Sequence, residues 1–407
     1  MSLRALQGIW RKALPTPVRR AVAPAVRQGL RAYAHAAGRP PAQVSGLLPI
    51  RLVGLFNGSH GIAASARLAA RAFEALGAPV ETVAIDQGLD WKASLRTDTP
   101  AIWIFHLNPP ELVGALAAMG PRRVTGPRFG YWAWELPKGP RDWLDDAALV
   151  DEVWTPSRYV AQAFAGARAP VRVVPHPLFL EDYAEVTPAP RATEFQAVAL
   201  FDFNSSAARK NPEGVIAAFR QAFGDDPACE LVIKTQNGRA HPQALAALRA
   251  KASGAVRIID ETWPYAEVKR LIAGADALVS LHRAEGFGLV MAEAMALGTP
   301  VVATGASGNL DFMDDASGVL VPTRSAPVDD PQAIYRGQSW FEPDIEAAAE
   351  ALRRLRDEPG LGARLAAAGR ERVARQLSPE AWLRSLPDAV QAAVTAQRSG
   401  LLGTTAG

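Results

Sequence analysis

Cysteine is almost absent from this sequence of 407 residues, which contains only Cys229. One cysteine cannot form an internal disulfide or a cysteine-based metal site, and this excludes a small secreted domain held by disulfides. Acidic residues are absent from the first 73 positions, which carry eleven Lys or Arg before the first acidic residue, Glu74. The rest of the chain holds the other 33 of the 44 basic residues and all 41 acidic ones. Because the basic excess is local, we expect an anionic surface as partner and no nucleic acid.

Long apolar runs are also absent. No run approaches the ~20 residues of a transmembrane helix, and basic residues interrupt the N-terminal apolar stretches, unlike the core of a secretion signal. We therefore expect a cytoplasmic protein. Residues 1–45 are predicted to form a basic amphipathic arm that Pro15, Pro17 and Pro24 break into pieces. This arm either docks on an anionic membrane surface, at the inner membrane face, or is a solvated tail.

The composition that is present, 49% hydrophobic and 21% charged, is typical of a folded protein. Strand patterns alternate with helical patterns in two series, which predict domains over 46–186 and 192–378 with a proline-containing linker at 185–194. The predicted strands are 50–57, 81–85, 101–107, 128–134, 195–203, 229–235, 256–260, 277–282 and 300–304. This alternation predicts an α/β fold of two Rossmann-like domains facing across a cleft, with ligands at the strand ends. A final helix over 379–396 is expected to pack back on the first domain.

The strongest cluster of functional residues follows the strand that ends at His282. A loop with Gly286 and Gly288 comes next, and a helix is predicted to begin near Leu289. Glycines allow a close approach of the backbone, and the free N–H groups of a helix N-terminus attract anions. The segment therefore predicts a phosphate site.

Two glutamates and two cations complete the polar candidates. Glu293 lies in an otherwise apolar run, where a charge is costly unless a polar group such as a sugar or ribose hydroxyl meets it. Glu285 lies on the loop, eight positions earlier. Arg209 and Lys210 follow another strand end, and adjacent cations there suit a diphosphate. The alternatives are a capped helix with a partner-bound glutamate and a solvated basic turn.

Taken together, these motifs resemble glycosyltransferase family 4, whose members are retaining enzymes of GT-B fold. The matching segments are SLHRAEGFGL at 280–289 with Glu293, RKNP at 209–212, GASGNLDFM at 305–313, GYWAWELP at 130–137 and DEVWTPSRYVAQAF at 151–164. The resemblance covers roughly residues 50–390. Its motifs are specific for the family and not for one sugar. The basic arm lies outside it.

The resemblance implies roles for individual residues. Arg209 and Lys210 would hold the donor diphosphate, Glu285 would contact the donor sugar near the reacting carbon, and Glu293 would hold the ribose hydroxyls. The implied catalytic residues are Glu285, His106, Arg209 and Lys210. The implied donor-binding residues are Gly58, Gly61, Asn204, Arg209, Lys210, His282, Gly286, Phe287, Gly288, Leu289, Glu293 and Asn309. His106 could instead be a core histidine, and Asn309 could serve only its turn.

Tryptophan is concentrated in one segment, with four of the ten between positions 132 and 154. Trp132 and Trp134, with Glu135 as a polar contact, could form a platform for an acceptor sugar or a lipid-linked acceptor. The alternative is that both rings pack at the edge of the first domain's core.

These observations predict a retaining hexosyltransferase that uses a GDP- or UDP-linked sugar. The acceptor would be a saccharide or lipid-linked saccharide of bacterial surface polysaccharide or lipopolysaccharide synthesis. The GNLDFM turn resembles that of mannosyltransferases and favours mannose. The departing phosphate could accept the acceptor's proton, so no protein nucleophile is assigned. Without an Asp-x-Asp or His-Glu-x-x-His motif, no metal or other cofactor is required. The alternatives are a catalytically silent homologue that binds within a glycan-assembly complex, a sugar phosphorylase and an epimerase.

Overall fold

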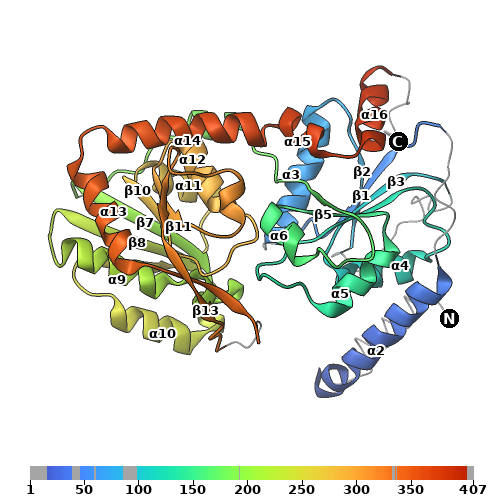
Figure 1. The fold of residues 1–407 in the computed structure, drawn as a ribbon, viewed down its shortest axis with the longest axis horizontal. Helices are drawn as coiled ribbons and strands as arrows, with labels where there is room; N and C mark the ends of the chain where they lie inside the picture. The colour runs from blue at the N-terminus through green and yellow to red at the C-terminus, as the bar shows by residue number, and fades with distance from the viewer. Residues whose placement is uncertain are drawn as a thin grey trace.

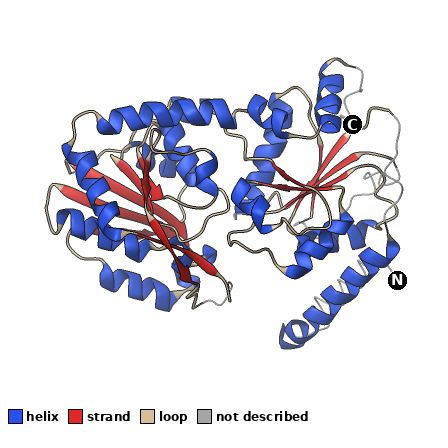
Figure 2. Ribbon diagram, viewed as in Figure 1, coloured by secondary structure: helices blue, strands red, loops and turns tan. Residues whose placement is uncertain are grey.

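The computed structural model describes residues 16–38, 46–58, 61–85, 99–191, 193–331, 335 and 337–400. Two parallel six-stranded sheets lie in two lobes (Figure 1), and helices flank each sheet (Figure 2). The predicted α/β fold with two Rossmann-like domains is confirmed.

The sheet of the first domain has the strand order β2-β1-β3-β4-β5-β6. Its strands are β1 (Ile50–Gly54), β2 (Glu81–Ala84), β3 (Ile102–His106), β4 (Arg128–Tyr131), β5 (Glu152–Thr155) and β6 (Val171–Val173). Its helices are α3 (Gly61–Ala75), α4 (Pro109–Met119), α5 (Arg141–Asp146), α6 (Arg158–Ala163) and α7 (Glu181–Ala184).

Strand β3 shows why this sheet is buried on both faces. Ile102 and Ile104 belong to one apolar cluster, whereas Trp103 and Phe105 belong to another. Successive side chains of a strand point to opposite faces, so an uninterrupted apolar strand needs helices on both sides. The segment 128–134, predicted as one strand, is a strand only over β4.

The sheet of the second domain has the order β12-β11-β10-β7-β8-β9, and β13 and β14 form a separate antiparallel hairpin. The strands are β7 (Phe195–Asp202), β8 (Cys229–Gln236), β9 (Val256–Asp260), β10 (Ala277–Ser280), β11 (Val301–Thr304), β12 (Val319–Val321), β13 (Thr323–Pro327) and β14 (Ser339–Pro343). The helices are α8 (Ala207–Lys210), α9 (Pro212–Phe223), α10 (Pro242–Lys251), α11 (Tyr265–Ala273), α12 (Leu289–Leu297), α13 (Ile345–Asp357) and α14 (Leu361–Leu377).

The end of the chain returns to the first domain. Helix α14 runs along the second domain, and α15 (Pro379–Ser385) and α16 (Asp388–Arg398) then lie on the first (Figure 1). The single helix predicted over 379–396 is wrong, because Pro387 favours an extended conformation at Leu386, which has φ −77° and ψ 157°. The buried ring of Trp382 meets Phe73 of α3 edge-on, with 4.8 Å between ring centroids.

The N-terminal arm contains a continuous helix, α2 (Thr16–Ala37), which runs through Pro24. The prediction that the prolines break this part of the arm is therefore wrong. The last turns of α2 lie on the first domain, where Arg31 Nε donates to Asp146 Oδ1 at 2.6 Å and His35 Nε2 lies 2.8 Å from the same oxygen. Residues 1–15 are outside the described part of the chain. None of the helices in that part is both long and apolar enough to cross a bilayer.

Replacing Trp382 tests whether the terminal helices stabilise the first domain. We expect Trp382→Ala to lower the free energy of unfolding by about 3–5 kcal/mol, because it empties a buried aromatic site. Urea unfolding would measure the loss. The exposed Arg384 lies on the same helix, and Arg384→Ala should change the value by less than about 0.5 kcal/mol. Equal effects of the two substitutions would contradict the packing role of α15.

Candidate active site

A charged cluster lies at the carboxyl ends of β7 and β10. Arg209 Nη1 lies 3.4 Å from Glu285 Oε2, and Lys210 Nζ donates to the same oxygen. Arg209 Nη1 also donates to the carbonyl of Ala284 at 2.8 Å, and its side chain is 4% exposed. Carboxyl ends of parallel strands meet at one edge of the sheet, and this brings together residues 75 positions apart in the chain.

Local backbone geometry holds the two cations in place. Ser206 (φ 60°) and Asn211 (φ 54°) bound the short helix α8, and both are left-handed positions. Asn211 Oδ1 accepts from Gly214 N at 3.1 Å, and its Nδ2 donates to the carbonyl of Leu281 at 2.9 Å. Pro212 then occupies the first turn of α9, where its missing N–H costs nothing. The RKNP segment is therefore a fixed turn.

Glu285 and Arg209 are both charged at neutral pH. Burial alone would raise the pKa of Glu285, but Lys210 and Arg209 lower it to about 2. Burial likewise opposes the charge of Arg209, but the carboxylates of Glu285 and Glu135 outweigh this effect and raise its pKa. Arg209 Nε is buried and has no hydrogen-bond partner within the described residues. Two cations that share Glu285, with one donor unused, suit an anionic ligand.

His282 and Asn309 lie behind this cluster, and both are wholly buried. His282 Nδ1 is 3.0 Å from Ser280 Oγ, and its Nε2 is 3.2 Å from Asn309 Oδ1. Asn309 Nδ2 donates to the carbonyl of Thr304 at 3.0 Å. Burial lowers the pKa of His282 to about 4, so the ring is neutral. These two residues hold the loops around Glu285 in place. For Asn309, this fits the alternative of a role in its turn.

The glycine loop lies where the two domains meet. Ser157 Oγ of the first domain donates to the carbonyl of Gly286 at 2.6 Å, and a Cβ at Gly286 would lie 2.7 Å from the carbonyl oxygen of Trp134. Phe287 is buried and packs edge-on against His176 of the first domain, at 4.6 Å. Gly288 (φ 97°) caps α12 just before Leu289. This loop needs glycine at Gly286 because the other domain approaches its backbone.

Glu293 lies on α12 and is 8% exposed. Tyr183 Oη donates to Glu293 Oε1 at 3.4 Å, and Tyr265 also forms a hydrogen bond with this carboxyl group. Burial raises the pKa of Glu293 to about 7, although the hydrogen bonds with the two tyrosines lower it in part. These tyrosine hydroxyls fit the alternative of a partner-bound glutamate, and the role of Glu293 in holding ribose hydroxyls stays a prediction.

His106 belongs to a second polar cluster, in the first domain. Ser65 Oγ is 2.5 Å from His106 Nε2 and 2.9 Å from His176 Nδ1, and Tyr131 Oη is 3.0 Å from that same nitrogen. Burial lowers the pKa of His106 and lowers that of His176 to about 4, so both rings are neutral. The cavity beside them measures about 10 Å³, the space of about one water. The burial of His106 fits the alternative that this residue is a core histidine.

Sequence reasoning missed the other members of this second cluster. His176 lies three residues after the end of β6, and a histidine close to a strand end would have been a signal. We did not predict that strand, because three residues of β6 leave too short a pattern.

The tryptophan segment divides into a part buried in the first domain and a part that contacts the second domain. Trp132 is wholly buried, with Phe164 edge-on at 5.5 Å. Its predicted acceptor contact is therefore wrong, because the core covers its ring. Trp134 is partly buried, and its Nε1 donates to the carbonyl of Lys138 at 2.9 Å. Glu135 Oε2 accepts from the hydroxyl of Tyr335 at 3.0 Å.

Among the described residues, the remaining candidates form no hydrogen bond with the side chains of Arg209, Lys210 or Glu285. The carbonyl of Gly58 accepts from Arg67 Nη1 at 2.9 Å, and Gly61 begins α3. The two residues between these glycines are outside the described part of the chain. Asn204 is exposed, and its Oδ1 is 2.9 Å from His241 Nε2. Within the described ranges, no group of three or more His, Cys, Asp or Glu could hold a metal ion.

The pKa of Glu293 predicts a pH-dependent stability. The native carboxyl keeps its proton up to about pH 7, whereas the unfolded one loses it near 4.5. This group therefore contributes full stability below pH 4.5 and loses it as the pH rises through 7. Relative to the wild type, Glu293→Gln should gain about 2 kcal/mol in free energy of unfolding between pH 5 and 8. Urea unfolding at both pH values measures the gain. The same gain in Glu380→Gln, at an exposed position, would contradict this assignment.

Comparison with known proteins agrees with this architecture. Residues 203–372 match the family described as glycosyl transferases group 1, and this range contains Arg209, Glu285 and Glu293. None of the curated proteins matches the sequence.

Solved structures extend the likeness to both domains. Anabaena HepE in complex with UDP and glucose is 16% identical, with a TM-score of 0.60 over 85% of this chain and 100% of that one. Sucrose-phosphate synthase from Thermosynechococcus elongatus is 17% identical, with a TM-score of 0.63 over 87% and 99%. TarM is 16% identical, with a TM-score of 0.53 over 73% and 56%. The chain therefore has the GT-B fold, and residues 203–372 of its second half are similar to glycosyl transferases group 1.

Proposed function

We propose that this protein is a retaining glycosyltransferase that moves a hexose from a nucleotide diphosphate sugar to a saccharide or lipid-linked saccharide. The observation that carries the proposal is the buried cluster of Arg209, Lys210 and Glu285 at the carboxyl edge of the second sheet. HepE, a similar protein, is described in complex with UDP and with UDP-glucose, which supports a nucleotide-sugar donor. Mannose as the hexose, GDP or UDP as the carrier and a bacterial surface glycan as the product belong to the same proposal.

The proposed reaction places negative charge where the cations lie. When the bond between sugar and diphosphate breaks, the departing phosphate gains charge that Arg209 and Lys210 can stabilise without reorganisation. The acceptor hydroxyl would attack from the same face as the departing phosphate, which would take the proton. Glu285 keeps both cations in position and would lie beside the sugar carbon.

Substitutions in the cluster test this function. We expect Arg209→Ala and Glu285→Gln each to lower transfer by at least about 10²-fold, because each disturbs the charges prearranged for the leaving group. The matched control is Arg257→Ala, at an exposed arginine of β9. Circular dichroism would show whether the variants are folded. Full transfer by a folded Arg209→Ala variant would contradict the proposal.

Nucleotide binding separates an active enzyme from a silent homologue. Melting curves with GDP, UDP, ADP and dTDP should show stabilisation by one of them, about 2.7 kcal/mol at 100 times its Kd. Arg209→Ala should lose this stabilisation. If none of the four stabilises the wild type, the silent homologue becomes the better description.

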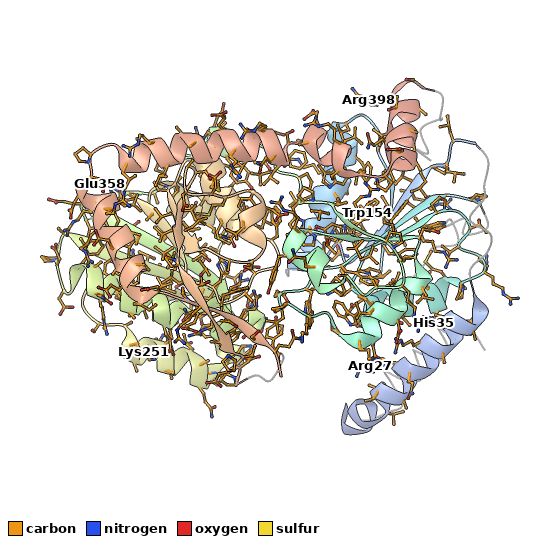
Figure 3. All side chains as sticks on the ribbon, in the orientation of Figure 1. Arg27, His35, Trp154, Lys251, Glu358 and Arg398 are labelled. Atoms are coloured by element: carbon orange, nitrogen blue, oxygen red, sulfur yellow. The ribbon has the colours of Figure 1, made fainter. Side chains whose placement is uncertain are left out.

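Helix α2 supports docking on an anionic membrane surface from the cytoplasmic side, which is a further part of the proposal. Val22, Val26 and Tyr33 are 40%, 40% and 50% exposed. Spacings of four and seven residues place these three on one helical face. Arg31 and His35 lie on the opposite face and hold the helix to the first domain. Figure 3 shows Arg27 and His35 on this helix.

The positive charge of helix α2 favours an anionic lipid surface as the partner of this apolar face. No acidic residue occurs before Glu74, and the helix itself carries Arg19, Arg20 and Arg27. An amphipathic helix with cations beside its apolar face binds at the boundary of anionic headgroups.

Two matched double variants test membrane docking. Val22→Glu/Val26→Glu should lower binding to phosphatidylglycerol vesicles at least tenfold, because it places charge on the apolar face. Gln28→Glu/Ala32→Glu makes the same change in net charge at other exposed positions and should lose less. A flotation assay measures both. Equal losses in the two variants would contradict a role for the apolar face, as would a wild type that binds neutral vesicles equally well.

A further inference from the structure

The β13–β14 hairpin contributes one side chain to the interface between the domains, and the proposed mechanism does not use this side chain. The connection between its strands contains Tyr335, which is 7% exposed. The hairpin lies on the side of the second domain that faces the first (Figure 1). Its contacts reach the segment 134–138 of the first domain.

The ring of Tyr335 and the side chain of Gln338 dock that segment. The ring lies edge-on to Trp134 at 5.9 Å and joins an apolar cluster that includes the wholly buried Leu136. Gln338 accepts from Lys138 N and donates to Lys138 O, both at 3.1 Å. These contacts hold the two domains together without any charged group.

The hydroxyl of Tyr335 has a separate partner. It donates to Oε2 of Glu135 at 3.0 Å, whereas no hydrogen bond to the other oxygen, Oε1, occurs among the residues that the structure describes. The negative charge of Glu135 also stabilises the guanidinium of Arg209 and helps to raise its pKa. Two carboxylates, Glu285 from the second domain and Glu135 from the first, therefore flank one buried cation.

We infer that Tyr335 is a positioning residue that fixes the Glu135 carboxylate, so that its Oε1 accepts a hydrogen bond from a sugar hydroxyl beside Arg209 and Glu285. This inference rests on the proposed function. A carboxylate with one oxygen held and one open is a directional acceptor for a hydroxyl, and the fixed oxygen prevents it from turning onto Arg209. The hydroxyl belongs either to the donor hexose or to the acceptor sugar.

Removal of one hydroxyl tests the inference. Tyr335→Phe keeps the ring that docks the segment 134–138 and loses only the hydrogen bond to Glu135. The wild type is first assayed for cleavage of UDP-glucose, GDP-mannose, ADP-glucose and dTDP-glucose, and the fastest is used as donor. Tyr335→Phe should lower kcat for transfer to methyl α-glucoside or methyl α-mannoside about tenfold, the effect of one lost hydrogen bond. The Kd of the matching nucleoside diphosphate should stay within twofold.

Further variants separate positioning from docking. Glu135→Gln should show a similar loss, and the double variant should lose little more, because both substitutions remove one coupled pair. The control is Tyr159→Phe. Among the described residues, the Tyr159 hydroxyl donates its hydrogen bond to the backbone carbonyl of Glu135 at 3.2 Å and not to its carboxylate, so this variant should stay within twofold of the wild type. Amide exchange over 134–138 should be unchanged in Tyr335→Phe.

The assay without acceptor identifies the sugar. If cleavage by water falls together with transfer, the hydroxyl belongs to the donor hexose; if only transfer falls, it belongs to the acceptor. Wild-type kcat in Tyr335→Phe would overturn the inference. Parallel changes in nucleotide Kd and in amide exchange would also overturn it, because they would make Tyr335 only a docking residue. A wild type that binds no nucleotide and cleaves no donor would remove the proposed function itself.

Discussion

The pairing of Arg209 and Lys210 with the single carboxylate of Glu285 is the interaction on which the rest of the site depends. Arg209 is buried, and Lys210 and Glu285 are partly buried beside it. Charges withdrawn from water in this way are tolerated only when partners and geometry are nearly complete. The left-handed residues Ser206 and Asn211 set that geometry on one side. On the other side, Glu285 N donates to Ser307 Oγ at 3.2 Å. The buried polar residues around the cluster therefore hold its charged groups in position.

The contact between the domains is a second constraint, and it acts on the same loops. Ser157 caps α6 with its side chain and also donates to the carbonyl of Gly286. Arg158 pairs with Asp311 nearby, with Nε and Oδ1 3.3 Å apart. Because α15 and α16 return to the first domain, both these C-terminal helices and the contacts between the loops connect the two domains. A ligand that binds between the domains must fit this arrangement or change it.

Much of the fold could be predicted because its signals are local. The apolar run around Ile102 indicates a strand buried on both faces, and Asn211-Pro212 is typical of a helix start. The errors have local causes too. Pro24 lies within a continuous helix, because one lost hydrogen bond does not end a helix that the first domain supports further along. Pro387 ends helix α15 at a position where the pattern of apolar residues does not predict a break.

The sequence by itself determined the alternation of strands and helices, the turn that presents Arg209 and Lys210, and the glycines beside Glu285. All of these depend on residues within a few positions of one another. Only the tertiary structure decided that Trp132 is a core residue, that His106 shares Ser65 with His176, and that Tyr335 meets Glu135 across 200 positions. Burial and pairing between distant segments depend on how the sheets and loops pack, and no local pattern in the sequence records that packing.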